Sequence, residues 1–331
     1  MNYKQLTSFF KYLAKNNILY SPVLEKPGGR FLIQEVTDIS EIDLNGRLPD
    51  YPWREQLLPQ QEILFNIQQN KLLESDLNKL LPQVLLGVGL PDLRALTLYD
   101  LVFEKDKYYQ ARKRKTLVVG YINLGAKSDY THWHKQYEEN ILEHLKFDVF
   151  IEIVKTGQIK VFSGSEKGQK ILEAAGIKDY QHIDYAGAVL EGKLNQEMVA
   201  LQKAMQSKYN KKLWQSLGKK CLACGKCALV CPTCFCFYAQ DQIELDKGQG
   251  KRTRCWDTCF YNNFSKVAGG NKFQDNNAKR IHFWYEHKFV RIPAQFQISG
   301  CVGCGRCTKA CPVSIDILKT KKTLLKDSRK K

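Results

Sequence analysis

The sequence predicts two dissimilar domains: an N-terminal domain of mixed strands and helices (α/β or α+β) and a mainly helical C-terminal domain. Strand-like apolar runs alternate with helical segments over residues 1–190, the pattern of an α/β domain. All twelve cysteines lie at or after Cys221, so the first 220 residues contain none. With 331 residues, the chain is long enough for two domains with separate cores.

Several elements of the N-terminal domain can be placed. Apolar residues at helical spacing predict an amphipathic helix over the first fifteen residues. Residues 148–154 and 158–162 are expected to form a hairpin around the turn at residues 155–157. The other expected elements are strands at residues 30–36, 83–88 and 115–122, a helix at residues 92–103 and a connecting helix over residues 191–215.

One cysteine pattern occurs twice in the C-terminal part, at residues 221–232 and 301–312, and each copy has the form C-x2-C-x2-C-x3-C-P. This spacing wraps a cubane [4Fe–4S] cluster, in which each iron binds one thiolate sulfur. In ferredoxins with two clusters, the fourth cysteine of each run ligates the other cluster. We therefore expect cluster 1 to be bound by Cys221, Cys224, Cys227 and Cys311, and cluster 2 by Cys301, Cys304, Cys307 and Cys231.

The two runs also set the expected bounds of the domain. Residues 216–318 are expected to be ferredoxin-like, with an insertion at residues 237–300, because 69 residues separate Cys231 from Cys301. A basic tail at residues 319–331 is expected to fray. Zinc is the alternative metal, but zinc sites prefer two separated C-x2-C pairs.

Four further cysteines lie between the runs: Cys234, Cys236, Cys255 and Cys259. Their number suits a third metal site, and that alternative stays open. Their spacing is not a standard cluster run, however, and their aromatic neighbours are typical of buried thiols. Structural thiols are therefore the favoured interpretation, which about 12 iron atoms per chain instead of about 8 would overturn.

The positive charge is concentrated on the cysteine-rich part. The whole chain has a formal net charge of +17, and the residues from Ser216 onward contain 22 Lys and Arg against 8 Asp and Glu. Such a surplus attracts an acidic partner protein, binds nucleic acid or solubilises a surface. Nucleic acid is the least favoured partner, because no basic and aromatic binding module and no ATPase loop is readable.

Two other motifs have plain structural interpretations. Gly87-Val-Gly89 is similar to a dinucleotide loop, but Asp92 stands where a third glycine is needed and would repel a pyrophosphate. His132 and His134 could coordinate a metal, but surface or packing histidines are the default interpretation of such a pair.

The compartment can be inferred from the cysteines and the apolar runs. The lopsided cysteine distribution does not suit a disulfide framework, which indicates a reducing compartment. Residues 1–17 lack the apolar core and cleavage site of a signal peptide. No apolar run reaches the roughly 18 residues that a membrane span needs. We therefore expect a cytoplasmic protein without a membrane partner.

Several motifs together resemble the β (iron–sulfur) subunit of cytoplasmic, NAD(P)-linked [NiFe] hydrogenases, a family also called sulfhydrogenases; the corresponding iron–sulfur subunit of anaerobic sulfite reductase is similar. These motifs are residues 221–237, 254–260, 267–271, the pair His287-Lys288 and residues 301–307, and the resemblance extends over most of the chain. It implies an electron-transfer subunit that is not itself catalytic.

The resemblance also implies partners. Two [4Fe–4S] clusters would relay single electrons between a flavoprotein diaphorase subunit, which holds FAD and NAD(P), and the small and large subunits of the [NiFe] hydrogenase. In the alternative complex, a sirohaem subunit reduces sulfite.

The chain departs from this family in its N-terminal domain, where relatives usually carry cysteines. Pro91 and Asn123 stand at the matching positions, and a Cys-x-Cys stretch has no counterpart. If these cysteines hold an additional cluster in relatives, this chain has lost it. An N-terminal fragment of residues 1–200 that purified with iron would refute that interpretation.

Overall fold

The computed structural model describes residues 1–26, 28–69, 71–126, 141–188, 196–206, 211–244 and 246–328. The chain forms two compact units. The first comprises residues 1–58 and 76–188, and the second comprises residues 59–75 and 189–331. The N-terminal domain was expected to run without interruption over residues 1–190. That expectation was wrong for residues 59–75, which fold with the cysteine-rich unit.

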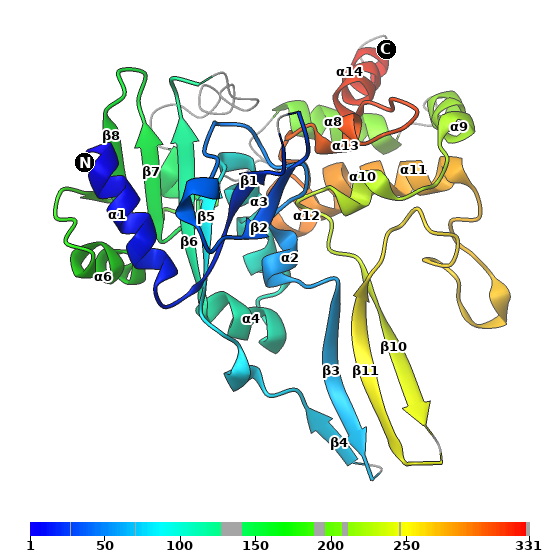
Figure 1. The fold of residues 1–331 in the computed structure, drawn as a ribbon. Coiled ribbons are helices and arrows are strands. Elements are labelled where there is room, and N and C mark those ends of the chain that lie inside the picture. The colour runs from blue at the N-terminus through cyan, green and yellow to red at the C-terminus, as the bar shows by residue number, and fades with distance from the viewer. Residues whose placement is uncertain are drawn as a thin grey trace. The chain divides into compact units, whose positions relative to one another are not determined.

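The first unit is built on a seven-stranded mixed sheet in the order β2-β1-β5-β6-β7-β8-β9 (Figure 1). Its central strands β5 and β6 run parallel, and almost every residue of both is buried. Their continuous Val- and Leu-rich sequences suit such a position, because a parallel central strand is covered on both faces. The strands are β1 (Ile18–Leu24), β2 (Phe31–Glu35), β5 (Gln83–Val88), β6 (Thr116–Asn123), β7 (Val149–Ile153), β8 (Ile159–Ser163) and β9 (Gln181–His182).

Helices complete this unit. Helix α1 (Tyr3–Ala14) begins with a capping box between Asn2 and Gln5 and buries Leu6, Phe9 and Leu13 in the core of the sheet. This helix and the antiparallel hairpin of β7 and β8 confirm two sequence predictions. The remaining helices are α2 (Arg54–Leu57), α3 (Leu90–Val102), α4 (Lys107–Arg114), α6 (Glu166–Ala174) and the 3₁₀ turns η1 (Ile39–Glu41), η2 (Leu77–Lys79) and η3 (Ile141–His144).

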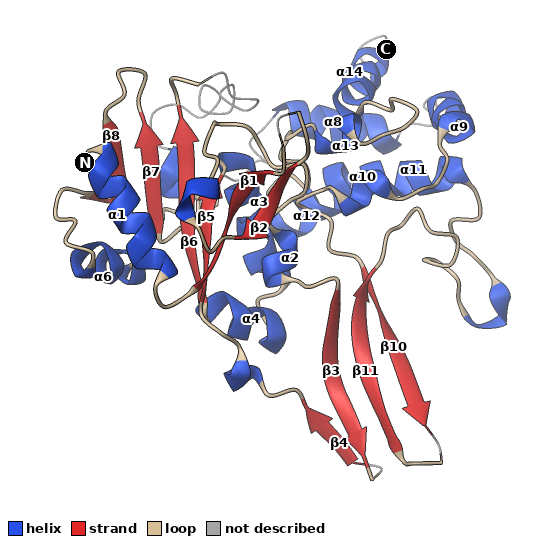
Figure 2. Ribbon diagram, viewed as in Figure 1, coloured by secondary structure: helices blue, strands red, loops and turns tan. Residues whose placement is uncertain are grey.

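A four-stranded antiparallel sheet in the second unit joins segments that lie far apart in the sequence (Figure 2). Its order is β10 (Phe237–Glu244), β11 (Gln249–Trp256), β3 (Gln61–Gln68) and β4 (Lys71–Glu74). A buried ion pair between Glu62 and Arg254 ties β3 to β11. The expected mainly helical domain did not include this sheet. Every residue of β10 is exposed, so no alternation of apolar and polar residues marks it as a strand.

The rest of the second unit is helical. Helices α11 and α9 pack together, as do α14 and α8, around a core that contains Trp214, Trp284, Tyr285 and Phe289. The expected connecting helix is replaced by α8 and α9, with residues 189–195 and 207–210 outside the described part. The helices are α8 (Gln196–Gln206), α9 (Lys211–Lys220), α10 (Lys226–Leu229), η5 (Ala268–Gly270), α11 (Asn277–Glu286), the π-helical turn η6 (His287–Arg291), α12 (Ile292–Phe296), α13 (Arg306–Lys309) and α14 (Ile317–Ser328).

The C-terminal segment corrects one expectation. Residues 319–331 were expected to fray, but α14 extends to Ser328. The reason is apolar burial, since Ile317 and Leu324 of this helix lie in the core. Across the part of the chain that the structure describes, no helix combines the length and apolar character that crossing a bilayer requires.

Candidate iron–sulfur centres

The two cysteine runs fold into loops with the same backbone course. Gly225 (φ +75°) and Gly305 (φ +76°) occupy the same position in each loop and cap the short helices α10 and α13. Two residues earlier, Ala223 (φ +54°) and Gly303 (φ +66°) are also left-handed. An L-residue in this region costs about 1–2 kcal/mol, so Ala223 is held there by its surroundings. Two sequence-distant runs therefore place their thiols in equivalent ways.

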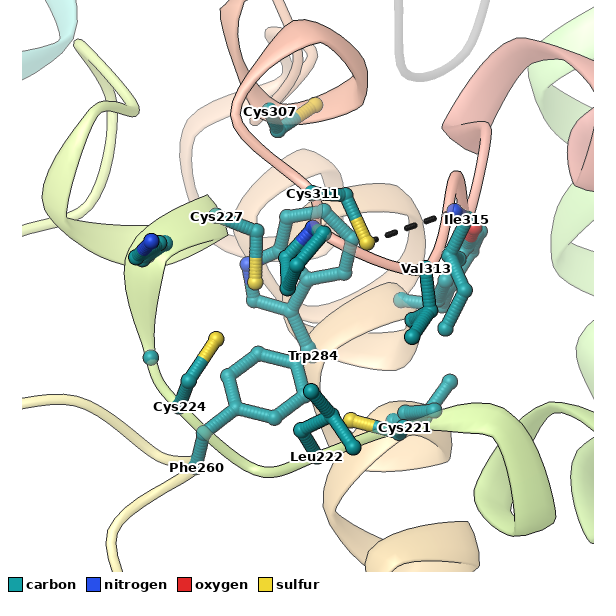
Figure 3. Close-up of a pocket in the computed structure, with 15 residues that line it drawn as sticks. Cys221, Leu222, Cys224, Cys227, Phe260, Trp284, Cys307, Cys311, Val313 and Ile315 are labelled. Atoms are coloured by element: carbon teal, nitrogen blue, oxygen red, sulfur yellow. Dashed lines mark hydrogen bonds between the residues drawn. The ribbon is translucent and has the colours of Figure 1, made fainter.

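Four thiols of one expected set line a common cavity (Figure 3). The sulfurs of Cys221, Cys224, Cys227 and Cys311 surround one space beside Trp284 and Phe260. The other lining residues are mostly apolar: Leu222, Gly225, Lys226, Ile281, Tyr285, Cys307, Pro312, Val313 and Ile315.

Backbone N–H groups in the first run and just after the second run point toward these sulfurs. The N–H of Ala223 donates to Cys221 Sγ over 3.3 Å, and the N–H of Ile315 donates to Cys311 Sγ over the same distance. Such hydrogen bonds favour a charged thiolate over a neutral thiol. This cavity, which we call cavity A, thus combines four sulfur donors, apolar walls and N–H groups aimed at sulfur. That is the donor set of a cubane.

A second cavity, cavity B, gathers the other expected set. Its lining includes the cysteines Cys231, Cys301, Cys304 and Cys307, together with Trp284, Lys288, Val302, Gly303, Gly305, Ile317 and Leu318. Cys231 comes from the first run and the other three come from the second, as the ferredoxin spacing predicts. The thiols again stand among apolar groups, so this set also suits a cubane.

The two cavities share a wall. Cys307 and Trp284 line both of them. The indole Nε1 of Trp284 is buried, and within the described residues it has no hydrogen-bond partner. A buried donor without a partner is costly, and a cluster sulfur beside it would accept its hydrogen bond. The shared wall means that two groups held in these cavities would be close neighbours.

Some thiols in each cavity resist ionisation. Burial raises the pKa of Cys227 and of Cys307 far above the usual value, and repulsion from neighbouring thiolates adds to the effect. Burial also raises the pKa of Cys301. Iron binding would therefore release protons from these groups and supply the charge that stabilises the thiolates.

Among the described residues, no three His, Cys, Asp or Glu side chains stand close enough for one metal ion.

Cys231 differs from the other thiols. A hydrogen bond from Cys234, the ammonium of Lys288 and the backbone N–H of Thr233 hold its pKa well below the usual value, although burial opposes them. Lys288 Nζ lies 3.1 Å from Cys231 Sγ. Burial by itself would lower the pKa of Lys288, but the nearby thiolates, Cys231 first among them, raise it above its usual value. Each group of the pair thus favours the charged form of the other.

The four remaining cysteines, Cys234, Cys236, Cys255 and Cys259, differ in their contacts. Cys236 is close enough to interact electrostatically with both Cys234 and Cys259. Cys255, in contrast, makes a hydrogen bond with Tyr238, its partner across the β10–β11 ladder. The four therefore include a group of three and a separate thiol. A third metal site here stays a prediction.

Two weaker sequence motifs were a glycine loop at residues 87–89 and the histidine pair at residues 132 and 134. Gly87 has φ +93°, and a Cβ there would come within 2.5 Å of a side-chain carbon of Leu44, so packing explains this glycine. Asp92 is buried in the first turn of α3. His132 and His134 lie outside the described residues.

Comparison with known proteins supports the cluster interpretation. Residues 220–315 match the family described as the 4Fe-4S dicluster domain. Along almost its whole length the chain is similar to "Sulfhydrogenase 2 subunit beta" of Pyrococcus furiosus. The two are 27% identical over 325 residues, which cover 94% of this chain and 93% of that protein. The chain is a homologue of this hydrogenase subunit.

The resemblance to hydrogenase β subunits that the motifs indicated is thereby confirmed. No solved structure matches the chain.

Two side chains that no sequence motif marks lie beside the cysteines. Trp284 lines both cavities, and Thr233 contacts Cys231. An internal tryptophan or threonine has no spacing rule that would mark it, so only the fold shows its place beside the cysteines.

Proposed function

We propose that this chain is the electron-transfer subunit of a hydrogenase complex and relays single electrons through two [4Fe–4S] clusters. The observation that carries the proposal is the pair of cysteine-lined cavities with Cys307 and Trp284 as a common wall. Neighbouring clusters exchange electrons quickly, and each cubane carries one electron at a time. The name of the Pyrococcus furiosus relative, a sulfhydrogenase subunit, supports a place in a multi-subunit complex.

The proposed ligands follow the cavities. Cys221, Cys224, Cys227 and Cys311 would hold cluster 1 in cavity A, and Cys301, Cys304, Cys307 and Cys231 would hold cluster 2 in cavity B. The clusters supply one-electron redox chemistry, whereas hydride chemistry needs a flavin. We therefore propose a flavoprotein partner with FAD and NAD(P) on one side of the relay and the [NiFe] subunits on the other.

Cysteine replacement tests the crossed ligand sets. Cys231→Ser should remove cluster 2 and leave cluster 1, although Cys231 belongs to the first run. Cys311→Ser should do the reverse. Each variant should keep about 4 of about 8 iron atoms, with a different EPR signal remaining in each case. Cys255→Ser, a buried thiol that lines neither cavity, is the control and should keep all of its iron. If each variant instead lost the cluster of its own run, the crossed assignment would be wrong.

Purification of the native complex tests the function. The tagged chain, isolated without oxygen from its own cells, should bring down [NiFe] subunits together with a flavoprotein that contains FAD, and NAD(P)H should bleach its visible absorbance. A sirohaem subunit in place of the [NiFe] subunits would move the chain to a sulfite reductase. Isolation as a single protein that NAD(P)H cannot reduce in the cell extract would contradict the proposal.

A further inference from the structure

Lys288 is a charged side chain in an apolar core. It is 1% exposed and lies on η6, the π-helical turn between α11 and α12. Burying an ammonium costs free energy unless the charge is paired and all three of its donors are used. π-helical turns are themselves frequent at functional sites. The burial of this lysine and its place on a π-helical turn together indicate a functional role.

All three donors of Lys288 have acceptors. Its Nζ lies 3.1 Å from Cys231 Sγ, 2.9 Å from Thr233 Oγ1 and 3.1 Å from the carbonyl oxygen of Gly300. The Thr233 hydroxyl in turn donates to the same carbonyl over 2.7 Å. One ammonium therefore joins the end of the first cysteine run to the residue just before the second run.

The backbone holds this arrangement as well. The N–H of Gly300 donates to the carbonyl of Lys288 over 2.9 Å. A Cβ on Gly300 would come within 2.8 Å of the Lys288 Cα and within 2.7 Å of the Ile292 Cδ1. Glycine at position 300 thus lets the loop before Cys301 close directly onto η6. The position of the ammonium is therefore fixed both by the side-chain contacts of Lys288 and by the backbone contact between Lys288 and Gly300.

The contacts of Lys288 favour one cavity. It lines cavity B and touches Cys231, whereas the residues that line cavity A do not include it. Of the cysteines expected to hold cluster 2, it also interacts electrostatically with Cys301 and Cys307. A fixed positive charge in a medium of low dielectric acts strongly on a neighbour and weakly on a more distant group.

We propose that Lys288 is the positioning residue of cluster 2: it holds Cys231 toward cavity B and raises the reduction potential of that cluster relative to cluster 1. Reduction adds one negative charge to a cluster, and an ammonium that donates to a ligand sulfur stabilises the reduced state more than the oxidised state. The inference rests on the proposed clusters. Its consequence is a bias in the relay, because an electron would occupy cluster 2 more often than it would without the lysine.

A potentiometric EPR titration of three variants tests this proposal. In Lys288→Met, the wave that is missing in Cys231→Ser should move to lower potential. The expected change is at least tenfold in the reduction equilibrium constant, or about 59 mV for one electron. The other wave is an internal reference and should stay in place. Lys288→Arg keeps the charge and the donors, so its cluster 2 wave should stay close to the potential of the unaltered chain.

Lys266→Met removes one charge from an exposed residue that lines neither cavity, and it should leave both waves unchanged. If both waves of Lys288→Met also stayed in place while its iron content was normal, the lysine would have only a structural role and the proposal would fail.

A second experiment uses the unaltered chain, in case Lys288→Met does not assemble cluster 2. Protein grown with lysine labelled with ¹⁵N only at Nζ should show a nitrogen coupling in the pulsed EPR spectrum of reduced cluster 2. The same label in Lys288→Arg should show none. Absence of the coupling from the unaltered chain overturns the proposal. The iron content of that sample decides separately whether the clusters exist, so the two failures can be told apart.

Discussion

Two glycines at equivalent positions in the two cysteine loops provide a matched pair of substitutions. Gly225 and Gly305 have φ angles of +75° and +76°, so an alanine meets the same backbone cost at either position. Their surroundings differ. A Cβ at Gly225 would lie 2.7 Å from the Thr258 Cγ2 and 2.9 Å from the Tyr261 Cε1, whereas a Cβ at Gly305 meets nothing within 4 Å.

These contacts set the expected magnitudes. In Gly305→Ala, the left-handed backbone costs about 1–2 kcal/mol. The reduced freedom of the unfolded chain offsets about 0.4–1 kcal/mol of this cost. Gly225→Ala carries the same backbone cost and adds overpacking of about 1–3 kcal/mol. The exposed ring of Tyr261 can swing away, but Thr258 is fully buried and cannot, so the added cost remains.

Thermal bleaching of the cluster absorbance under argon, at one heating rate, is the assay. For a domain of 150–250 residues, 1 kcal/mol corresponds to a shift of about 2–4 °C. Gly225→Ala should therefore bleach about 2–12 °C below Gly305→Ala, and both should bleach below the unaltered chain. Equal midpoints for the two variants would refute the packing argument. A lower midpoint for Gly305→Ala would refute the assignment of which loop is covered.

Two further predictions concern ionisable groups in the second unit. Glu62→Gln should destabilise that unit by about 3–5 kcal/mol, because it leaves the buried Arg254 without its charge partner. In contrast, Asp241→Asn, at the exposed Arg252 pair of the same sheet, should shift the bleaching midpoint far less, because solvent screens that pair. The ratio of the two shifts in bleaching midpoint checks this. Burial, with Lys288 and Arg291 adding repulsion, lowers the pKa of His287 from 6.5 to about 4. The unfolded chain therefore binds a proton that the folded chain does not, and stability should fall as the pH drops from about 6.5 toward 4. His287→Phe, which keeps the stacking on Phe283, should flatten this dependence in midpoints measured across the same pH range, and an unchanged slope would contradict it.

Cluster ligation has a strict spacing, so the sequence alone predicts two cysteine sets, and the ligand assignment stays a prediction. The residues that line cavities A and B separate into the two groups of four that the crossed pattern predicts, with Cys307 also at the border of cavity A. The helix of residues 3–14 and the hairpin of β7 and β8 were predictable for a related reason. Each element has one buried face, and burial on one face leaves a period in the sequence.

Other features leave no such period. Residues 59–75 join the second unit through strand pairing with β11 and through the buried pair of Glu62 and Arg254, whose partners lie almost two hundred positions apart. In the sequence, Lys288 stands out only as part of a family motif. The role proposed for it depends on Thr233 and Gly300, which contact it only in the folded chain. Contacts between distant segments are decided by packing, so one sequence alone does not reveal them.

Metal analysis and EPR of the same anaerobic sample test most directly whether two clusters lie side by side in the second unit. We expect about 8 iron atoms per chain, no zinc, and a fully reduced spectrum in which two centres are magnetically coupled through their short separation. About 12 iron atoms would add a third cluster at the remaining cysteines. About 4 iron atoms, or two signals without coupling, would contradict the paired clusters and with them the proposed relay.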